Sequence, residues 1–411
     1  MSAFFASRWV DAPPTATEVT GLPQGFRAAG VPCGIKPSGG PDLGLLVSTA
    51  PETTSAARFT RSGVLAAPVL VCQERCRLDA LRAIVVNSGN ANAATGRRGL
   101  DEAARMQGAA AMTAGVSEDR VGVASTGVIG VQLDGQKVVR GLVDAREALS
   151  AEGDAAFAAA IMTTDAFEKR VSLALELPSG PVRLAAQAKG AGMISPAFAT
   201  LLVFVETDAA LSAETADLLL GVTVKRSFER ISVDGQLSTN DSVFLLASGA
   251  SGIAVEPQTD DEYRFGEALD AVMRQLALLV VADGEGAVRS GRVHVRGGHP
   301  EGVERVARAV ADSPLVKAAL NGGDPNWGRI AQAAGAALPG TAPLPLDVWI
   351  EGVHVCAGGT AIPFDAGVLA EAVAREEVSY EVGLPGEGAE AEVYFSDLSN
   401  DYVRINAEYT T

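Results

Sequence analysis

The stretch Lys189-Gly-Ala-Gly-Met-Ile-Ser-Pro-Ala-Phe-Ala-Thr200 leads directly into Leu201-Leu-Val-Phe-Val205, an apolar run typical of a buried strand. Gly190 and Gly192 permit backbone angles that other residues avoid, and Pro196 fixes another. Such a loop suits an exposed hydroxyl nucleophile, and it also suits a peptide bond that cuts itself. A tight turn before an ordinary strand is the commoner explanation of these residues taken alone.

The composition indicates a globular protein, and we expect it to be cytoplasmic. With 411 residues the chain is too long for one small core, so two or three domains are expected. Its longest apolar runs fall far short of the roughly 20 residues that a membrane-spanning helix needs, and no N-terminal targeting signal is recognised. The net charge of −17 argues against nucleic acid and anionic membranes as partners.

The cysteines and histidines do not form a recognised metal motif. Cys72 and Cys76 are separated by three residues, whereas His294, His299 and His354 lie in strand-like or turn segments. A zinc site would need a second pair of ligands at a matching spacing. We therefore expect reduced thiols and no metal.

Helix and strand patterns are mixed without a regular βαβ rhythm. Apolar spacing predicts helices over 101–114, 136–162, 212–220, 260–282 and 301–311. Strands are predicted over 82–86, 120–124, 201–205, 243–247, 346–350 and 391–395, and residues 1–80, with the runs 43–47 and 67–72, are expected to form short strands and turns. The mixture favours a layered α/β or α+β fold, with Pro343 and Pro345 as a candidate domain boundary.

The familiar catalytic motifs are missing. The chain has no G-x-S-x-G, H-E-x-x-H or Walker sequence, and three histidines make a Ser-His-Asp triad a poor candidate. A threonine freed as a new N-terminus needs no histidine, because its α-amino group, with a pKa of about 7.7–8.0, can take the hydroxyl proton. Thr126 and Gly127 end a predicted strand and would suit an oxyanion hole, although a plain turn is the commoner explanation.

Three further polar segments leave a structural and a functional interpretation open. Thr163 to Lys169 follows a predicted helix and would suit capping. Asp283-Gly-Glu-Gly286 ends the long helix, where glycines commonly form caps; a carboxylate there opposes the helix dipole, which favours a function for Glu285. Asn321 to Arg329 is rich in turn-forming residues and is equally well explained as a structural loop.

A series of short motifs follows in order along the chain. They are Gly25-Phe-Arg-Ala-Ala-Gly30, Asn87-Ser-Gly-Asn-Ala-Asn92, Ser125-Thr-Gly-Val-Ile-Gly130, Met162-Thr-Thr-Asp165, Lys189-Gly-Ala-Gly-Met-Ile194, Ala199-Thr200, Ser238-Thr-Asn-Asp241, Asp283-Gly-Glu-Gly286, Asp324-Pro-Asn-Trp-Gly-Arg329 and Tyr402-Val-Arg-Ile-Asn-Ala-Glu-Tyr-Thr-Thr411. From about residue 20 to residue 411 the chain thereby resembles the ornithine acetyltransferases, or glutamate N-acetyltransferases, of arginine biosynthesis.

The resemblance implies self-cleavage between Ala199 and Thr200, which gives an α chain 1–199 and a β chain 200–411. It implies that Thr200 carries the acetyl group, beside an oxyanion hole of Thr126 and Gly127. The implied substrate contacts are Thr163, Lys189, Thr200, Glu285, Asn406 and Thr411. The implied fold is an α/β sandwich around the N-terminal Thr nucleophile, with an additional C-terminal α/β domain from about 290–411.

The implied reaction is a ping-pong transfer of acetyl from N2-acetylornithine to glutamate, without a cofactor and with acetyl-CoA as a further candidate donor. The implied assembly is a heterotetramer of two α and two β chains. Two departures from the family pattern are Ser195-Pro-Ala-Phe198, which bears on self-cleavage, and Ala166, where a Thr is common. A Thr- or Ser-nucleophile aminopeptidase or amidase, and a non-catalytic binding protein of the same fold, remain open as alternatives.

Overall fold

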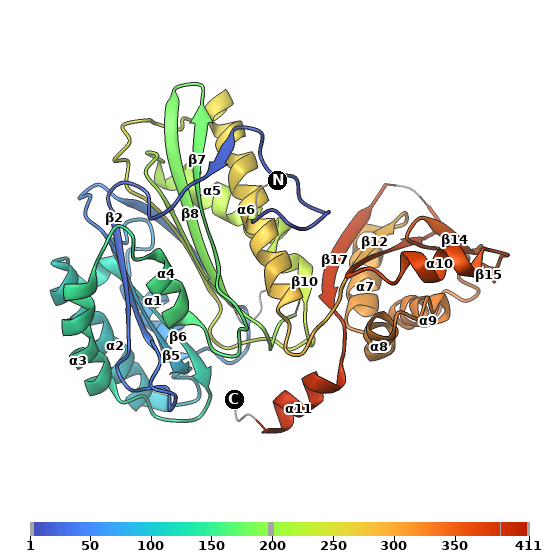
Figure 1. The fold of residues 1–411 in the computed structure, drawn as a ribbon, viewed down its shortest axis with the longest axis horizontal. Coiled ribbons are helices and arrows are strands. Elements are labelled where there is room, and N and C mark those ends of the chain that lie inside the picture. Colours follow the sequence, from blue (N-terminus) through green and yellow to red (C-terminus); the bar gives the residue numbers. More distant parts are fainter. Residues whose placement is uncertain (1–3, 196–200, 387, 409–411) are drawn as a thin grey trace.

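The computed structural model describes residues 4–195, 201–386 and 388–408, which form three sheets flanked by helices (Figure 1). The six-stranded sheet has the order β1 (Ala16–Glu18), β7 (Lys169–Leu177), β8 (Gly180–Lys189), β9 (Leu202–Thr207), β11 (Ser242–Ala247), β4 (Thr54–Phe59). The four-stranded sheet has the order β2 (Phe26–Val31), β3 (Leu43–Ser48), β5 (Ala83–Asn90), β6 (Val121–Val128). The helices packed on these two sheets are α1 (Ala67–Arg75), α2 (Gly96–Ala114), α3 (Gly135–Ala148), α4 (Asp154–Ile161), α5 (Ala213–Arg226) and α6 (Asp260–Ala282).

The two sheets form the middle of a layered body, and the position of β9 explains why residues 202–205 at its start are all apolar. Side chains alternate between the faces of a strand. Val203 and Val205 belong to the core under α5 and α6, whereas Leu202 and Phe204 belong to the core shared with the four-stranded sheet. Phe204 stacks on Phe244 with ring centroids 5.8 Å apart. Because both faces of β9 are covered, apolar side chains are favoured over residues 202–205.

Strand pairing brings the ends of several strands to one edge of the layered body. Lys189, the last residue of β8, lies opposite Leu202 at the start of the antiparallel strand β9. Leu202 in turn lies opposite Ser242 at the start of the parallel strand β11. The end of β6 is tied to the same edge, because Asn240 Nδ2 donates to the Ser125 carbonyl at 2.9 Å.

The third sheet lies to one side of the layered body (Figure 1), and residues 293–395 build a separate core there. Its order is β10 (Ile231–Ser232), β17 (Glu390–Ser396), β12 (Ser290–Arg296), β16 (Glu377–Gly383), β13 (Asp347–Ile350), β14 (Val353–Ala357), β15 (Thr360–Ala361). The helices of this part are α7 (Pro300–Ala311), α8 (Pro314–Gly322), α9 (Trp327–Ala337) and α10 (Ala366–Ala372). After β17, helix α11 (Asn400–Glu408) runs back toward the layered body (Figure 1).

The layered α/β fold predicted from the sequence is confirmed, and most predicted elements are present. The predicted helix 260–282 is α6, and the predicted helix 301–311 lies within α7. Ser212 caps α5 by accepting a hydrogen bond from the Thr215 amide, but α5 continues beyond Leu220 to Arg226. None of the helices within the described residues is long and apolar enough to cross a membrane.

Three sequence-based expectations were wrong. The run 67–72 is the helix α1 and not a strand, because Pro68 lies in the first turn, where its missing amide costs nothing. The helical region 136–162 is divided into α3 and α4 with Gly153 before the second helix. Pro343 and Pro345 lie between α9 and β13, inside the part of the chain that builds the third sheet, so they separate no domains.

Glu206 is a fully buried carboxyl in β9, on the same face as Phe204. Its Oε2 accepts a hydrogen bond from Gln187 Nε2 at 3.1 Å, and its Oε1 has no hydrogen-bond partner among the described residues. Burial raises the pKa of Glu206 to about 8, against the opposing effect of the Gln187 hydrogen bond. The folded protein therefore holds a neutral Glu206 at pH values where an unfolded glutamate, with a pKa of about 4.3, is ionised.

We predict that Glu206→Gln changes the pH dependence of stability. The contribution of Glu206 to the wild-type unfolding free energy falls as the pH rises from about 4.5 to about 8, because only the unfolded chain releases the Glu206 proton in that window. Glutamine has no such proton. The unfolding free energy of the variant relative to that of the wild type should therefore rise by at most about 1.4 kcal/mol per pH unit. Urea unfolding at pH 5 and pH 8 measures this gap in unfolding free energy between variant and wild type, with the exposed Glu267→Gln as control. An unchanged gap between the two pH values would contradict the assignment.

Candidate active site

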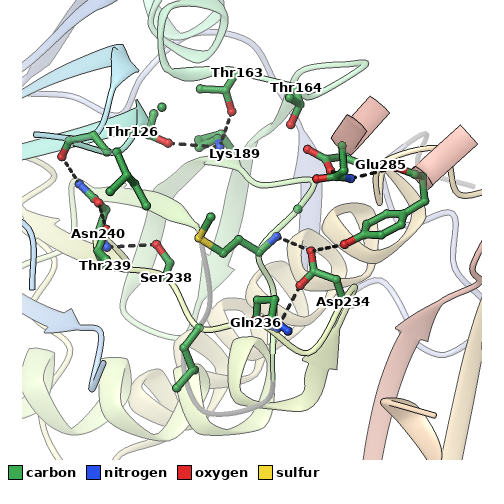
Figure 2. A pocket seen from close by; sticks show the side chains of 18 residues that line it. Thr126, Thr163, Thr164, Lys189, Asp234, Gln236, Ser238, Thr239, Asn240 and Glu285 are labelled. Atoms are coloured by element: carbon green, nitrogen blue, oxygen red, sulfur yellow. Dashed lines mark hydrogen bonds between the residues drawn. The ribbon is translucent and has the colours of Figure 1, made fainter. Parts of the chain in front are cut away.

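A cavity of about 230 Å³ lies at the edge where β6, β8 and β11 have their ends (Figure 2). Its walls come from segments that are far apart in the sequence. The lining residues are Ala91, Thr126, Gly127, Ile129, Thr163, Thr164, Lys189, Gly192, Met193, Asp234, Gln236, Leu237, Ser238, Thr239, Asn240, Glu285, Tyr402 and Asn406.

Lys189 provides the positive charge of one wall. Only 2% of its surface is exposed, and Nζ donates to Thr163 Oγ1 at 2.8 Å and to Thr126 Oγ1 at 3.4 Å (Figure 2). The Nζ atom is 3.8 Å from Asp165 Oδ2. Burial lowers the pKa of Lys189, and the Asp165 carboxylate opposes this effect. The ammonium is thus held beside two threonine hydroxyls and one carboxylate.

A buried ion-pair network stands behind this wall. Lys169 is fully buried, and its Nζ donates to Asp165 Oδ1 at 2.8 Å and to Asp283 Oδ2 at 2.5 Å. Asp165 also accepts hydrogen bonds from the Gly190 amide at 2.7 Å and the Thr163 amide at 2.9 Å. Burial alone raises the pKa of Asp165, but Lys189 and Lys169 outweigh it and hold that pKa well below its usual range. Asp165 therefore sets the backbone beside both Thr163 and Lys189.

Thr126 and Gly127 form the wall at the end of β6. Gly127 has φ +128°, and a Cβ atom there would lie 2.4 Å from the Gly89 carbonyl carbon. Only glycine fits this approach of β6 to β5. Thr126 is 3% exposed. Its oxygen accepts from Lys189, so the hydroxyl hydrogen is free to donate to another group.

Glu285 provides a negative charge on another wall (Figure 2). Its amide donates to the Ala191 carbonyl at 2.8 Å, and its Oε2 accepts from Asn406 Nδ2 at 2.8 Å. A Cβ atom on Gly192 would lie 2.7 Å from the Glu285 carboxyl carbon, so the carboxylate occupies space that Gly192 leaves open. The cavity thus offers an ammonium, hydroxyls and a carboxylate, which suit a small molecule that carries both charges.

Six of the residues singled out from the sequence line this one cavity, namely Thr126, Gly127, Thr163, Lys189, Glu285 and Asn406. Ala199, Thr200 and Thr411 lie outside the described residues. So do Pro196, Ala197 and Phe198 of the segment that departs from the family pattern. The motif Asp324–Arg329 does not line the cavity. Its Asn326 instead caps α9 by accepting a hydrogen bond from the Arg329 amide. Position 166 contributes its backbone amide, which donates to Asp283, so the departure at Ala166 leaves that contact intact.

Other functional candidates were missed by the sequence interpretation. Asp234 and Tyr402 line the cavity, and the pairing of Lys169 with Asp165 and Asp283 supports it. Asp165 and Asp283 stand within recognised motifs, which is a signal that was available, whereas Asp234 stands in an ordinary-looking turn. Among the described residues, no cluster of His, Cys, Asp or Glu is arranged to hold a metal ion.

Comparisons with known protein sequences cover nearly the whole chain. A sequence profile described as the ArgJ family matches residues 27–411. The arginine biosynthesis bifunctional protein ArgJ of Symbiobacterium thermophilum is 42% identical over 393 residues, which cover 95% of this chain and 98% of that protein. The protein of the same name from Rhodopirellula baltica is 43% identical over 404 residues, which cover 97% and 98%. A crystal structure of ornithine acetyltransferase complexed with ornithine, from Mycobacterium tuberculosis, is 36% identical with a TM-score of 0.42 and covers 46% of this chain and 100% of that one.

We predict that Lys169→Met destabilises the protein by about 3–5 kcal/mol, because it leaves Asp165 and Asp283 buried without their shared cation. The free energy of unfolding from urea titration measures the loss. The exposed Lys225→Met is the matched control and should change it by less than about 0.5 kcal/mol. A loss for Lys169→Met as small as that of the control would contradict a structural role of the network.

Proposed function

The chain belongs to the ArgJ family, and we propose that it transfers the acetyl group of N2-acetylornithine to glutamate, giving ornithine and N-acetylglutamate. It is an acyltransferase of arginine biosynthesis. The observation that carries the proposal is the cavity in which Lys189, hydrogen-bonded to two threonines, shares the walls with Glu285. Leu201, next to the proposed nucleophile Thr200, begins at the same edge, where its amide donates to Asp241 Oδ1 at 2.9 Å.

The proposed maturation step is self-cleavage between Ala199 and Thr200. The Thr200 hydroxyl attacks the Ala199 carbonyl carbon, so a C–O bond forms, the C–N bond breaks and the Thr200 nitrogen becomes a free amine. Water then hydrolyses the ester and leaves a carboxylate on Ala199. The products are the α chain 1–199 and the β chain 200–411. The new α-amino group lies on the same residue as the hydroxyl that it activates.

The proposed acetyl transfer uses the same hydroxyl twice. Thr200 attacks the acetyl carbonyl of N2-acetylornithine while its amine takes the hydroxyl proton, and ornithine leaves after its nitrogen receives that proton. The glutamate amine then attacks the acetyl-Thr200 ester and restores the hydroxyl. In both steps the Gly127 amide and the free hydroxyl hydrogen of Thr126 stabilise the oxyanion, at about 3–4 kcal/mol for each donor.

The proposed binding mode follows the charges of the cavity. Lys189, beside Thr163, pairs with the α-carboxylate that ornithine and glutamate share. Glu285, held by Asn406, faces the side-chain amine of ornithine, and the Thr411 carboxyl is a further candidate for that amine. These contacts grip the substrate at points away from the acetyl group and orient it for attack.

The remaining proposals concern partners and location. We propose an assembly of two α and two β chains that acts in the cytoplasm without a bound cofactor. We also propose acetyl-CoA as a second donor, which the word bifunctional in the names of the relatives supports.

Self-cleavage predicts two fragments from the wild type, divided between residues 199 and 200. A denaturing gel and intact mass measure the products. Thr200→Ala lacks the hydroxyl and should stay uncut and inactive, whereas Thr200→Ser keeps a hydroxyl and should still cut. A wild-type chain that is intact and fully active, or normal turnover by Thr200→Ala, would refute the nucleophile assignment.

Acetyl exchange between N2-acetylornithine and labelled glutamate tests the reaction itself, and Glu285→Gln tests the binding mode. We expect the variant to mature normally and to raise the KM for N2-acetylornithine about ten-fold, the effect of losing one charged hydrogen bond of about 1.4 kcal/mol. The KM for glutamate should change less. The exposed Glu408→Gln on α11 is the control.

Two outcomes of that assay would count against the proposal. Release of acetate that does not depend on glutamate would favour an amidase over a transferase. An equal rise in both KM values would contradict the place given to Glu285. Thiol release from acetyl-CoA in the presence of glutamate, run in parallel, decides whether the second donor is used.

A further inference from the structure

Asp234 clamps the backbone that leads to the proposed cut. Its Oδ2 accepts a hydrogen bond from the Met193 amide at 2.7 Å, and its Oδ1 accepts from the Ile194 amide at 3.0 Å. In return the Ile194 carbonyl accepts from the amides of Val233 at 2.9 Å, Asp234 at 3.3 Å and Gly235 at 3.1 Å. Ile194 is fully buried. The two segments are therefore joined in both directions a few residues before Ala199.

Met193 lies in a conformation that needs such support. Its φ is +59°, in the left-handed region that residues with side chains rarely adopt. Glycine would adopt this conformation without strain, but position 193 is a methionine. The Asp234 carboxylate holds the Met193 amide directly, and it holds the next amide with its other oxygen. Charge-assisted hydrogen bonds of this kind are stronger than neutral ones, so the carboxylate is suited to stabilise the left-handed turn.

The same carboxylate reaches the helix that completes the cavity. Tyr402 on α11 donates its hydroxyl to Asp234 Oδ2 at 3.4 Å. Burial, together with the Asp234 and Glu285 carboxylates, raises the pKa of Tyr402 to about 12, so the hydroxyl keeps its proton near neutral pH. One turn later α11 carries Asn406, the partner of Glu285.

On the far side of the proposed cut a second carboxylate holds the chain. The Leu201 amide donates to Asp241 Oδ1 at 2.9 Å. Asp234 and Asp241 belong to one short connection between β10 and β11. This connection therefore holds backbone amides on both sides of the proposed cut, and Asp234 is the member that also contacts α11.

We propose that Asp234 is a positioning residue for self-cleavage, which sets the path of the loop before residue 199 by holding the Met193 and Ile194 amides. The role rests on the proposed cut at 199/200. Attack of a hydroxyl on the neighbouring carbonyl depends on orientation, because it must reach a narrow range of angles. Asp234 supplies no group to the reacting atoms; it limits where the backbone leading to them lies.

The test is the rate at which freshly synthesised full-length chain divides at 199/200, followed by denaturing gel and intact mass. Asn has one acceptor oxygen in place of two, so Asp234→Asn should slow division about ten-fold or more, the usual effect of a lost charged hydrogen bond. Asp312→Asn is the matched control. Asp312 accepts from Ser232, the last residue of β10, but makes none of the contacts to the loop, and its variant should divide at the wild-type rate.

Rescue separates positioning from a general structural effect. Glycine adopts the left-handed conformation without strain, so Met193→Gly combined with Asp234→Asn should recover much of the lost rate. Asp234→Glu keeps the charge but displaces the carboxylate by one methylene, and it should also slow division. It serves as the second variant if Asp234→Asn does not fold.

The outcomes are distinct. Division of either folded Asp234 variant at the wild-type rate overturns the positioning role. So does slow division that Met193→Gly leaves uncorrected. A wild-type chain that never divides at 199/200 overturns the proposed function as well, and that failure is visible without any variant.

Discussion

The buried ammonium of Lys169, held between Asp165 and Asp283, is the interaction on which the site depends. Lys169, the first residue of β7, thereby ties Asp165 in the loop after α4 to Asp283 at the end of α6, and Lys169 and Asp283 are 114 residues apart in the sequence. Asp165 places the Thr163 and Gly190 amides, and Asp283 lies two residues before Glu285. The positive and the negative walls of the cavity therefore share one anchor. Burying three charges costs free energy that only close pairing and saturated hydrogen bonds offset, and Asp165 meets both conditions.

Asp165, a member of this network, also explains how the ammonium of Lys189 is tolerated in a buried position. Desolvation lowers the pKa of Lys189, and the attraction of the Asp165 carboxylate opposes that decrease. Because the Lys189 ammonium donates to the Thr126 oxygen, it fixes the direction in which the Thr126 hydroxyl can donate. Under the proposed function, this single charged group would both attract an anionic substrate and orient the Thr126 hydroxyl as an oxyanion donor. In the proposed reaction, binding and catalysis share that wall.

The sequence was most informative where local pattern and tertiary burial agree. The run 201–205 is apolar on both faces of β9, and the spacing in 260–282 matches a helix that packs along one face. It misled at 67–72, where a short apolar run fits a strand or a helix equally well. Motif order located Lys189 and Glu285, because those motifs are local. Asp234 was not predictable, since its contacts to Met193 and Tyr402 join three distant segments that no spacing rule connects.

The third sheet has a part in the site although it contributes no lining strand. Its strand β17 pairs in parallel with β10, with Ile231 opposite Tyr394, and β10 leads into the connection that carries Asp234. The same strand continues into α11, which carries Tyr402 and Asn406. A displacement of β17 would therefore move both the clamp on the Met193 turn and the partner of Glu285. The connection ends at β11 in the six-stranded sheet, and Ile231, Val233 and Val243 at its two ends belong to one buried core with Tyr394 of β17. The position of the Met193 turn thus derives from the packing of that core, which is why a short polar connection can hold a strained backbone in place.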